Sequence, residues 1–202
     1  MAIWLASGSQ RRAVILSSLF ADVHSESLDG VDETPPTGSV SSQVMSICKR
    51  KAAAVTSDDG FDVRVVADTM VSDPDDVNVA MGKAADELSA ASMLKRLSGC
   101  RHRVWSATGV RILGEWEFFV ESAVGQVDEL TMLMVHGLAS RKSLYVVFEF
   151  VFLLLLERSL KLVIVGFVAQ LHGSSFTVYP SRTRTLSLSV CTSSARFPPP
   201  LR

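Results

Sequence analysis

Apolar positions in the first part of the chain recur alternately at helical and at strand-like spacing. The apolar start at residues 2–4 predicts a short strand, and the run 13–19 after it has the spacing of a helix. A second helix is expected over residues 40–55, with an apolar stripe formed by Val40, Val44, Ile47, Cys48, Ala52 and Val55. Residues 63–67 predict a buried strand. Alternating strands and helices favour an α/β layered domain.

The pattern continues with one more helix and two more strands. A helix over residues 84–97 is expected to end at Ser98-Gly99 and to bury Leu88, Ala91, Leu94 and Leu97. Residues 103–113 and 118–127 predict strands.

After about residue 130 the composition changes. Residues 144–156 and 162–171 are apolar, but neither run has the roughly 20 residues that a bilayer span requires. A span over residues 144–171 would also bury Glu149, Glu157, Arg158 and Lys161, so no membrane segment is expected. Residues 181–202 are rich in Ser, Thr, Arg and Pro and predict disorder. The sequence therefore divides into residues 1–130 and an atypical region, 131–202.

The charge and the cysteine content indicate which partners and which cellular compartment to expect. The formal net charge of −1 provides no overall field that would attract nucleic acid. Cys48, Cys100 and Cys191 are widely spaced, without the pairs typical of metal sites, which indicates a reducing compartment. The first residues lack the pattern of a secretory signal, so a cytoplasmic location is expected.

The turn at residues 5–12, with the sequence LASGSQRR, is the first candidate for chemistry. It joins the expected first strand to a helix, whose free amide hydrogens and positive dipole end favour anions. Arg11 and Arg12 add fixed positive charge and bidentate donors. A polyphosphate would fit such a turn, and the alternative is an ordinary turn with two solvated arginines.

Three further charged residues lie at informative positions. Lys51 falls on the apolar stripe of its helix, so its ammonium either reaches the helix edge or meets an anionic partner. Asp68 ends the expected strand 63–67, and ligands of α/β sheets collect beyond the carboxyl ends of strands. Its carboxylate could bind a divalent cation, accept a proton from water, or cap a turn. Lys83 follows a glycine and could reach an oxyanion.

Glu33 and His102 are weaker candidates. Glu33 lies in a loop that two prolines keep from being helical, and alone it is typical of a solvated acid. His102 has no evident partner and is expected to be a strand or surface residue, not a ligand.

Taken in order, these segments resemble the Maf family of nucleoside triphosphate pyrophosphatases, relatives of the inosine triphosphate pyrophosphatases. The family motif LASxSPRR corresponds to residues 5–12, its KA pair to Lys51-Ala52, and its ADTxV strand to residues 67–71. Its GK turn corresponds to Gly82-Lys83, and an LSG, H-x-V and TG-V series follows within residues 97–110. The resemblance implies an α/β fold with a mixed sheet, flanking helices and a central cleft.

The resemblance also implies a reaction and a site. A nucleoside triphosphate would be hydrolysed between its α and β phosphorus atoms, giving a monophosphate and pyrophosphate. Asp68 would accept the proton of the attacking water, and Glu33 and Asp68 would hold Mg²⁺ or Mn²⁺. The substrate would be bound by Ser9, Arg11, Arg12, Lys51, Thr69 and Lys83. Thr69 resembles the branch that acts on dTTP and UTP, and with Arg12 it would contribute to base selectivity.

The second half of the chain departs from that pattern. The family's later segment with Lys and Gln, which completes the nucleotide pocket, and its closing G-LP segment have no counterpart after residue 130. A shifted reading frame is one explanation of residues 131–202. The alternative function is a Maf-like remnant that only binds nucleotide weakly. The resemblance leaves room for a homodimer and implies neither a nucleic acid nor a membrane as partner.

Overall fold

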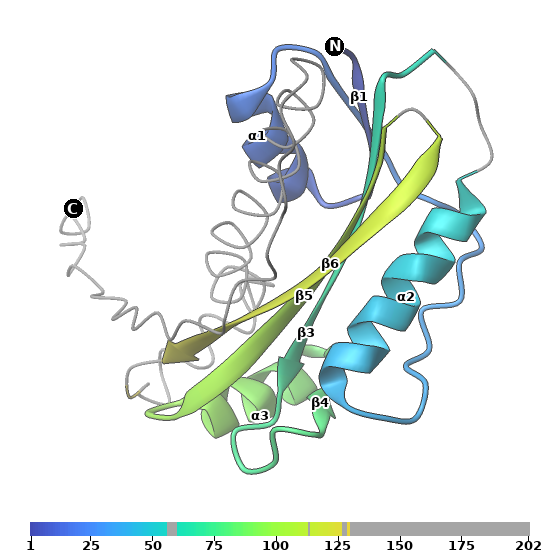
Figure 1. Ribbon diagram of the computed structural model, residues 1–202. Coiled ribbons are helices and arrows are strands. Elements are labelled where there is room, and N and C mark those ends of the chain that lie inside the picture. Colours follow the sequence, from blue (N-terminus) through green and yellow to red (C-terminus); the bar gives the residue numbers. More distant parts are fainter. Residues whose placement is uncertain (56–59, 113, 127–128, 130–202) are drawn as a thin grey trace, which may run out of the picture.

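The computed structural model describes residues 1–55, 60–112, 114–126 and 129 (Figure 1). Along the chain the elements are β1 (Ile3–Ala6), α1 (Gln10–Leu19), β2 (Val23–Glu26), α2 (Val40–Ala54), β3 (Val63–Ser72), β4 (Ala80–Met81), α3 (Glu87–Leu97), β5 (Arg101–Ile112) and β6 (Glu115–Gln126). The expectations for residues 131–202, including the apolar segment 144–171, lie outside the described residues. No described helix is long and apolar enough to cross a bilayer.

The strands form one mixed sheet, in agreement with the expected fold class. Its order is β2-β1-β3-β5-β6, with the short β4 also paired to β3. β1 is parallel to both β2 and β3, whereas β3, β5 and β6 are antiparallel neighbours. The parallel and antiparallel parts of the sheet therefore meet at β3.

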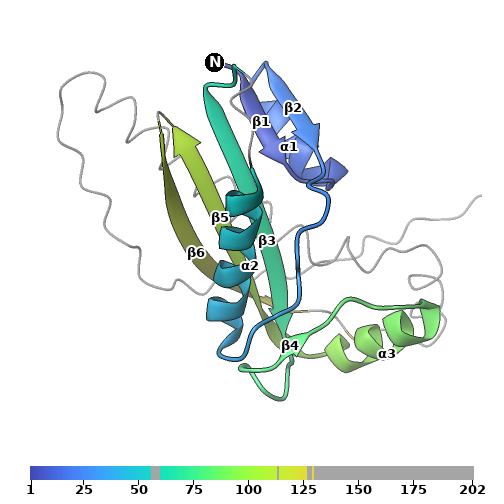
Figure 2. The same cartoon turned by 90° about the vertical axis from the view of Figure 1, so that its right-hand side faces the viewer.

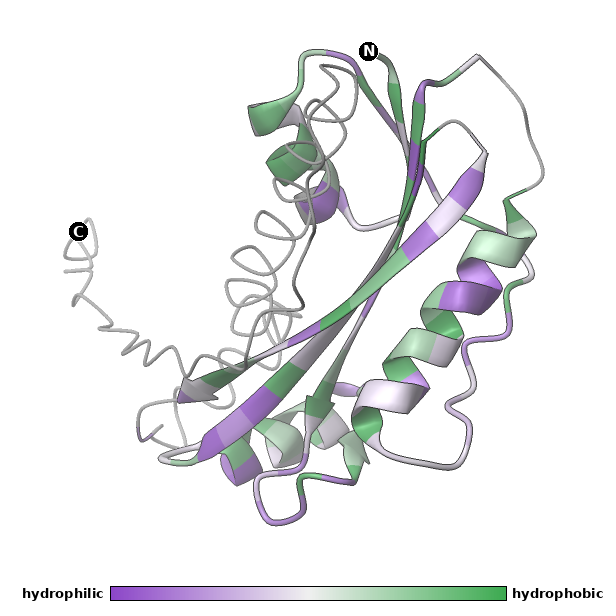
Figure 3. Cartoon of the chain, in the orientation of Figure 1, coloured by the Kyte–Doolittle hydropathy of each residue, from purple (hydrophilic) through white to green (hydrophobic). Residues whose placement is uncertain are grey.

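Helices cover both faces of this sheet. Figures 1 and 2 show α2 on one face, and Figure 1 shows α1 and α3 on the other. On the α1 face, Leu16 packs with Leu5 and Val65, and on the α2 face Val44 and Cys48 pack with Val66. Figure 3 shows apolar and polar residues interspersed along α2, as expected for a helix with one face on a sheet. Successive residues of β3 thus belong to different core layers.

The sequence pattern of α2 is confirmed in detail. All six residues of the predicted stripe are buried: Val40, Val44, Ile47, Cys48, Ala52 and Val55. Lys51 is buried on the same face, as its spacing indicated. The helix starts where the side chain of Ser39 accepts a hydrogen bond from the backbone of Ser42.

The start of α3 differs from the prediction. The helix begins at Glu87, not at residue 84, because Asp86 caps it and exchanges hydrogen bonds with Ser89. Leu88 is 78% exposed, so the prediction that it is buried is wrong. Its place on the inner face is taken by Ala90, which lies one and two turns before Leu94 and Leu97. The end at residues 98–99 is confirmed, with Gly99 at a φ of +69°.

Strand β3 is longer than predicted. The sequence indicated a strand over residues 63–67 that ends before Asp68, but β3 continues to Ser72. The reason is long-range pairing, since β5 forms an antiparallel ladder with β3 as far as Val71. Asp68 therefore lies within a strand, and the expectation that it follows the strand's end is wrong.

Candidate active site

The candidate residues gather where β3 extends beyond its parallel neighbour. β1 pairs with β3 only from Val63 to Val65, and its chain then leaves through a turn into α1. On its other side β3 remains paired with β5 through this region. Among the described strands, none pairs with β3 on the β1 side until β4 joins at Val71. This open edge exposes backbone carbonyls and lies next to the first turn of α1.

Arg12 occupies the open edge from the α1 side. Its Nη1 atom donates to Ser7 Oγ and to the backbone oxygen of Ala67, each at 3.0 Å. Its Nη2 atom donates to Thr69 Oγ1 at 3.4 Å. Arg12 thereby links the LASGSQRR turn to the middle of β3.

Asp68 points to the opposite face of the sheet from Thr69, because side chains alternate along a strand. There its Oδ1 atom lies 2.7 Å from Nζ of Lys51, which comes from α2. The side chains of Lys51 and Asp68 are only 11% and 12% exposed. Of the two expectations for Lys51, the structure shows the anionic partner.

Glu33 extends this pair into a chain of four charges. Its Oε1 atom lies 2.8 Å from Nζ of Lys51, and its Oε2 atom pairs with Nζ of Lys83. Partial burial opposes ionisation of Glu33, but hydrogen bonds and positive charge from the two lysines outweigh it and lower the pKa to about 2. Lysines and acids thus alternate in the order Lys83, Glu33, Lys51, Asp68.

Ser9 and Arg11 lie at the same turn as Arg12. Ser9 is the residue before α1, and its backbone amide donates to Ser7 Oγ at 3.3 Å, while its side chain does not cap the helix. Arg11 is in the first turn of α1, and its side chain is outside the described part of the structure. The described contacts therefore connect Ser9 to the site through Ser7 only.

Two residues of this region were not among the candidates. Ser7 accepts hydrogen bonds from Arg12 and from the backbone of Ser9, and its signal was its place within the LASGSQRR motif. Arg50 contacts the loop on both sides of Glu33, and no local pattern indicated that role.

His102 lies in a strand, which is one of the two positions expected for it. It is buried within β5, and this burial lowers the pKa of its imidazole.

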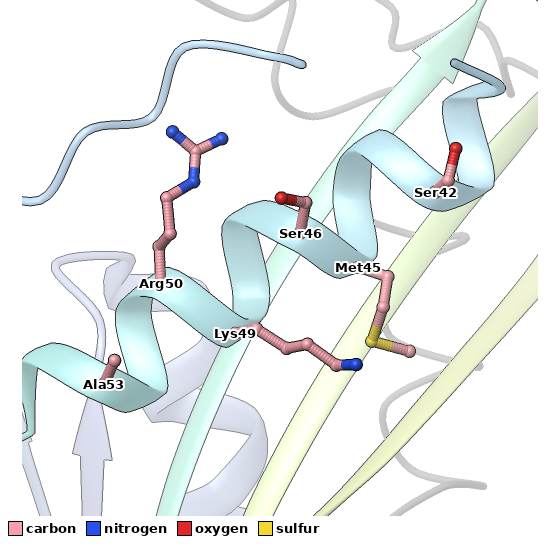
Figure 4. A pocket seen from close by; sticks show the side chains of 6 residues that line it. All are labelled: Ser42, Met45, Ser46, Lys49, Arg50 and Ala53. Atoms are coloured by element: carbon pink, nitrogen blue, oxygen red, sulfur yellow. The ribbon is translucent and has the colours of Figure 1, made fainter. Parts of the chain in front are cut away.

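Of the residues that make the contacts above, only Arg50 also lines a hollow on the surface of α2 (Figure 4). The hollow is lined by Ser42, Met45, Ser46, Lys49, Arg50 and Ala53. No candidate residue from the sequence is among its lining residues. The hollow therefore takes no part in the charged chain.

Glu33 and Asp68 are the candidate metal ligands. Both carboxylates contact the ammonium group of Lys51, so one oxygen of each lies close to the same position between α2 and β3. Among residues 1–55, 60–112 and 114–126, no group of three or more His, Cys, Asp or Glu could hold a metal ion. Mg²⁺ commonly takes one or two protein carboxylates and completes its shell with water and substrate phosphate. Two acids fit that mode and do not fit a cage made of protein alone.

Comparison with known proteins places this chain in a family. The family model described as Maf-like protein matches residues 2–138. A dTTP/UTP pyrophosphatase of Pelotomaculum thermopropionicum is 37% identical over 116 residues, which cover 55% of this chain and 56% of that protein. A dTTP/UTP pyrophosphatase of Bacillus mycoides is 39% identical over 115 residues, which cover 56% of each.

The similarity to the curated relatives covers only part of their length. The chain spans about half the length of the curated relatives it matches, 56% in the two cases above. The solved structure of the Staphylococcus aureus Ham1 protein is 15% identical, with a TM-score of 0.42 over 62% of this chain and 71% of that one. The family model, by contrast, covers every candidate residue described above, and the chain belongs to the Maf family of proteins.

Proposed function

We propose that this chain is a nucleoside triphosphate pyrophosphatase that acts on dTTP and UTP, and that residues 1–130 carry the activity. The observation behind the proposal is the chain of charges from Lys83 to Asp68, which lies beside the contact between Arg12 and Thr69. Curated relatives named dTTP/UTP pyrophosphatase are 36–39% identical to this chain over 115–118 residues.

The charges suit a triphosphate that arrives with a divalent cation. Without substrate, the two lysines are neutralised by Glu33 and Asp68. The phosphate oxygens of a triphosphate would replace the carboxylates as partners of the Lys51 and Lys83 ammonium groups. Further hydrogen-bond donors to the phosphates would come from Ser9, Arg11 and Arg12. The two carboxylates are then released from their lysines.

Glu33 and Asp68 would hold Mg²⁺ or Mn²⁺ in that state. Their donor set of two carboxylates leaves most of the coordination shell to phosphate and water. Such a cation supplies Lewis-acid chemistry, which stabilises the negative charge that develops on the leaving pyrophosphate.

Asp68 is also proposed as the proton acceptor. A water molecule attacks the α phosphorus, and the bond from that phosphorus to the oxygen bridging the α and β positions breaks. The electron pair leaves with pyrophosphate, and the proton of the water passes to the Asp68 carboxylate. The monophosphate keeps the oxygen of the attacking water.

Arg12 and Thr69 are proposed to contribute to the choice of base. They lie on the face of β3 opposite Asp68, so the base would be recognised on one face of the strand while the Asp68 carboxylate acts on the other. The guanidinium of Arg12 is held by Ser7 and the carbonyl of Ala67, which fixes the orientation of its donors.

The test is pyrophosphate release by the purified full chain with Mg²⁺ or Mn²⁺. We expect release from dTTP and UTP, and its loss in Asp68→Asn, which keeps the shape of the side chain but not its charge. Asp76→Asn is the matched control, because Asp76 lies exposed in the loop between β3 and β4. Equal rates in wild type and Asp68→Asn would remove Asp68 from the proposed mechanism.

A second function, nucleotide binding without hydrolysis, is favoured by one observation. The chain matches only 56% of the length of its curated relatives, so parts of their sites could lie beyond the matched region. Under this alternative the full chain binds UTP in a calorimetric titration and releases no pyrophosphate with either metal.

A further inference from the structure

We propose that Arg50 is a positioning residue, which holds the loop around Glu33 so that this carboxylate meets Lys51 and Lys83. The inference rests on the proposed function, in which Glu33 is a metal ligand. It concerns a residue that touches neither the charged chain of four residues nor, under that proposal, the substrate.

The guanidinium of Arg50 donates hydrogen bonds to the loop residues on both sides of Glu33. Its Nη1 atom lies 2.6 Å from Oδ2 of Asp32, and its Nη2 atom lies 2.6 Å from the backbone oxygen of Thr34. Two donors on one planar guanidinium, each bound to a different group, fix the orientation of the loop as well as its distance. The residue between the two contacts is Glu33 itself.

Other features of the loop support a fixed conformation. The backbone amide of Thr34 donates to Oδ1 of Asp32 at 2.8 Å, which closes a small turn around Glu33. Pro35 and Pro36 follow directly and restrict the backbone of Thr34 and their own φ angles.

Arg50 is partly covered by its surroundings on α2. Its side chain is 31% exposed, and its Nε atom is buried without a hydrogen-bond partner among the described residues. Figure 4 shows Arg50 pointing away from α2 toward the neighbouring loop, whereas Lys49 points the other way. Lys49 instead lies over the ring of Phe118, 5.6 Å from its centroid.

The position of Arg50 in the sequence explains how the site is assembled. Arg50 and Lys51 are consecutive on α2, so their side chains leave the helix about 100° apart. Lys51 enters the buried side and binds the Glu33 side chain, while Arg50 stays outside and binds the backbone and side chain that flank it. Two consecutive residues of α2 therefore contact three consecutive residues of the loop, Asp32, Glu33 and Thr34.

The experiment compares Arg50→Ala with Lys49→Ala in the full chain. Lys49→Ala is matched because it removes one positive charge from the adjacent position of the same helix. In the ligand-free protein we expect Arg50→Ala to increase deuterium uptake at residues 31–35, and Lys49→Ala to leave it unchanged. Asp32→Ala, which removes one of the two anchors, provides a second variant with the same expected change should Arg50→Ala not fold.

Kinetics separate positioning from general stability. We expect Arg50→Ala to raise the Mg²⁺ concentration for half-maximal pyrophosphate release by about 10-fold or more, the usual effect of losing a group that orients a metal ligand. In a Glu33→Ala background, adding Arg50→Ala should change the rate less than about twofold, because it acts through Glu33.

Unchanged uptake in Arg50→Ala, or multiplying effects in the double variant, would overturn the proposal. If the wild-type chain releases no pyrophosphate, the proposed function fails, and deuterium uptake alone then decides whether Arg50 holds the loop.

Discussion

Lys51 and Asp68 meet between α2 and β3, with Nζ 2.7 Å from Oδ1 and both side chains nearly nine-tenths covered. The same ammonium group lies 2.8 Å from Oε1 of Glu33. A covered charge is stable only with its counter-ion, since desolvation costs several kcal/mol for each ion. Stability and the proposed chemistry therefore depend on the same three side chains.

The first prediction concerns the loss of this lysine. Lys51→Met keeps most of the apolar stem but leaves Asp68 and Glu33 without their shared partner. We expect the free energy of unfolding to fall by about 3 kcal/mol, as for other broken buried pairs. Urea denaturation followed by circular dichroism measures the change. Lys49→Met, at an exposed site on the same helix, should stay within about 0.5 kcal/mol of wild type.

The second prediction is a pH dependence that comes from Glu33. Its pKa is about 2 in the folded protein, compared with an ordinary value of 4.5. A lowered pKa means that ionised Glu33 stabilises the fold above pH 4.5, and that this stability is lost as the pH falls toward 2. Unfolding free energies measured at pH 6, 4.5 and 3 should therefore decrease more in wild type than in Glu33→Gln. Parallel curves for the two proteins would contradict this contribution.

The third prediction concerns the reactivity of Cys48. Burial first, and the negative charge of Asp68 second, raise the pKa of this thiol to about 12. Cys48 is fully buried on the side of α2 that packs against the sheet, whereas Cys100 is partly exposed. At pH 8, iodoacetamide should label Cys100 and leave Cys48 unmodified until the protein is unfolded in guanidinium chloride. Peptide mass spectrometry distinguishes the two sites, and native labelling of Cys48 would show that α2 opens readily.

Local periodicity accounts for what the sequence predicted well. The stripe of α2 repeats at helical spacing, so the burial of Val44 and the inward position of Lys51 both follow from the residues of one helix. The start of α3 also depends on residues close together in the sequence, since Asp86 and Ser89 form its N-terminal cap. A prediction that used this cap would have put Leu88 on the exposed face of the helix.

Long-range pairing accounts for what the sequence did not predict. β3 extends past Asp68 because β5 pairs with it, and β5 lies more than thirty residues further along the chain. The strands β2 and β4 have little apolar pattern, since β2 is mostly exposed and β4 has two residues. The contacts of Arg50 depend on the path of a loop, which no spacing within α2 reveals.

The fourth prediction tests the close contact between β5 and its neighbours. A Cβ atom at Gly109 would lie 2.7 Å from Cε1 of Phe118 and 2.8 Å from Cγ2 of Val66. Gly109→Ala should therefore displace both side chains and lower the unfolding free energy by about 1–3 kcal/mol. Gly82→Ala is the control, because nothing lies within 4 Å of the added atom. Thermal melts of the two variants should differ clearly, and equal melting temperatures would mean that the ring of Phe118 moves aside at little cost.

The last prediction separates base selection from the proton transfer to Asp68. Thr69→Val keeps the shape of the side chain but removes the oxygen that accepts a hydrogen bond from Arg12 at 3.4 Å. Because Thr69 faces away from Asp68, the variant should retain pyrophosphate release. We expect kcat/KM for UTP relative to CTP to fall by about 10-fold or more, the worth of one hydrogen bond to a charged group. Thr37→Val, in the exposed loop before α2, should leave the ratio unchanged. A uniform loss of activity on both nucleotides would instead mean that the contact between Arg12 and Thr69 orients the phosphate-binding turn.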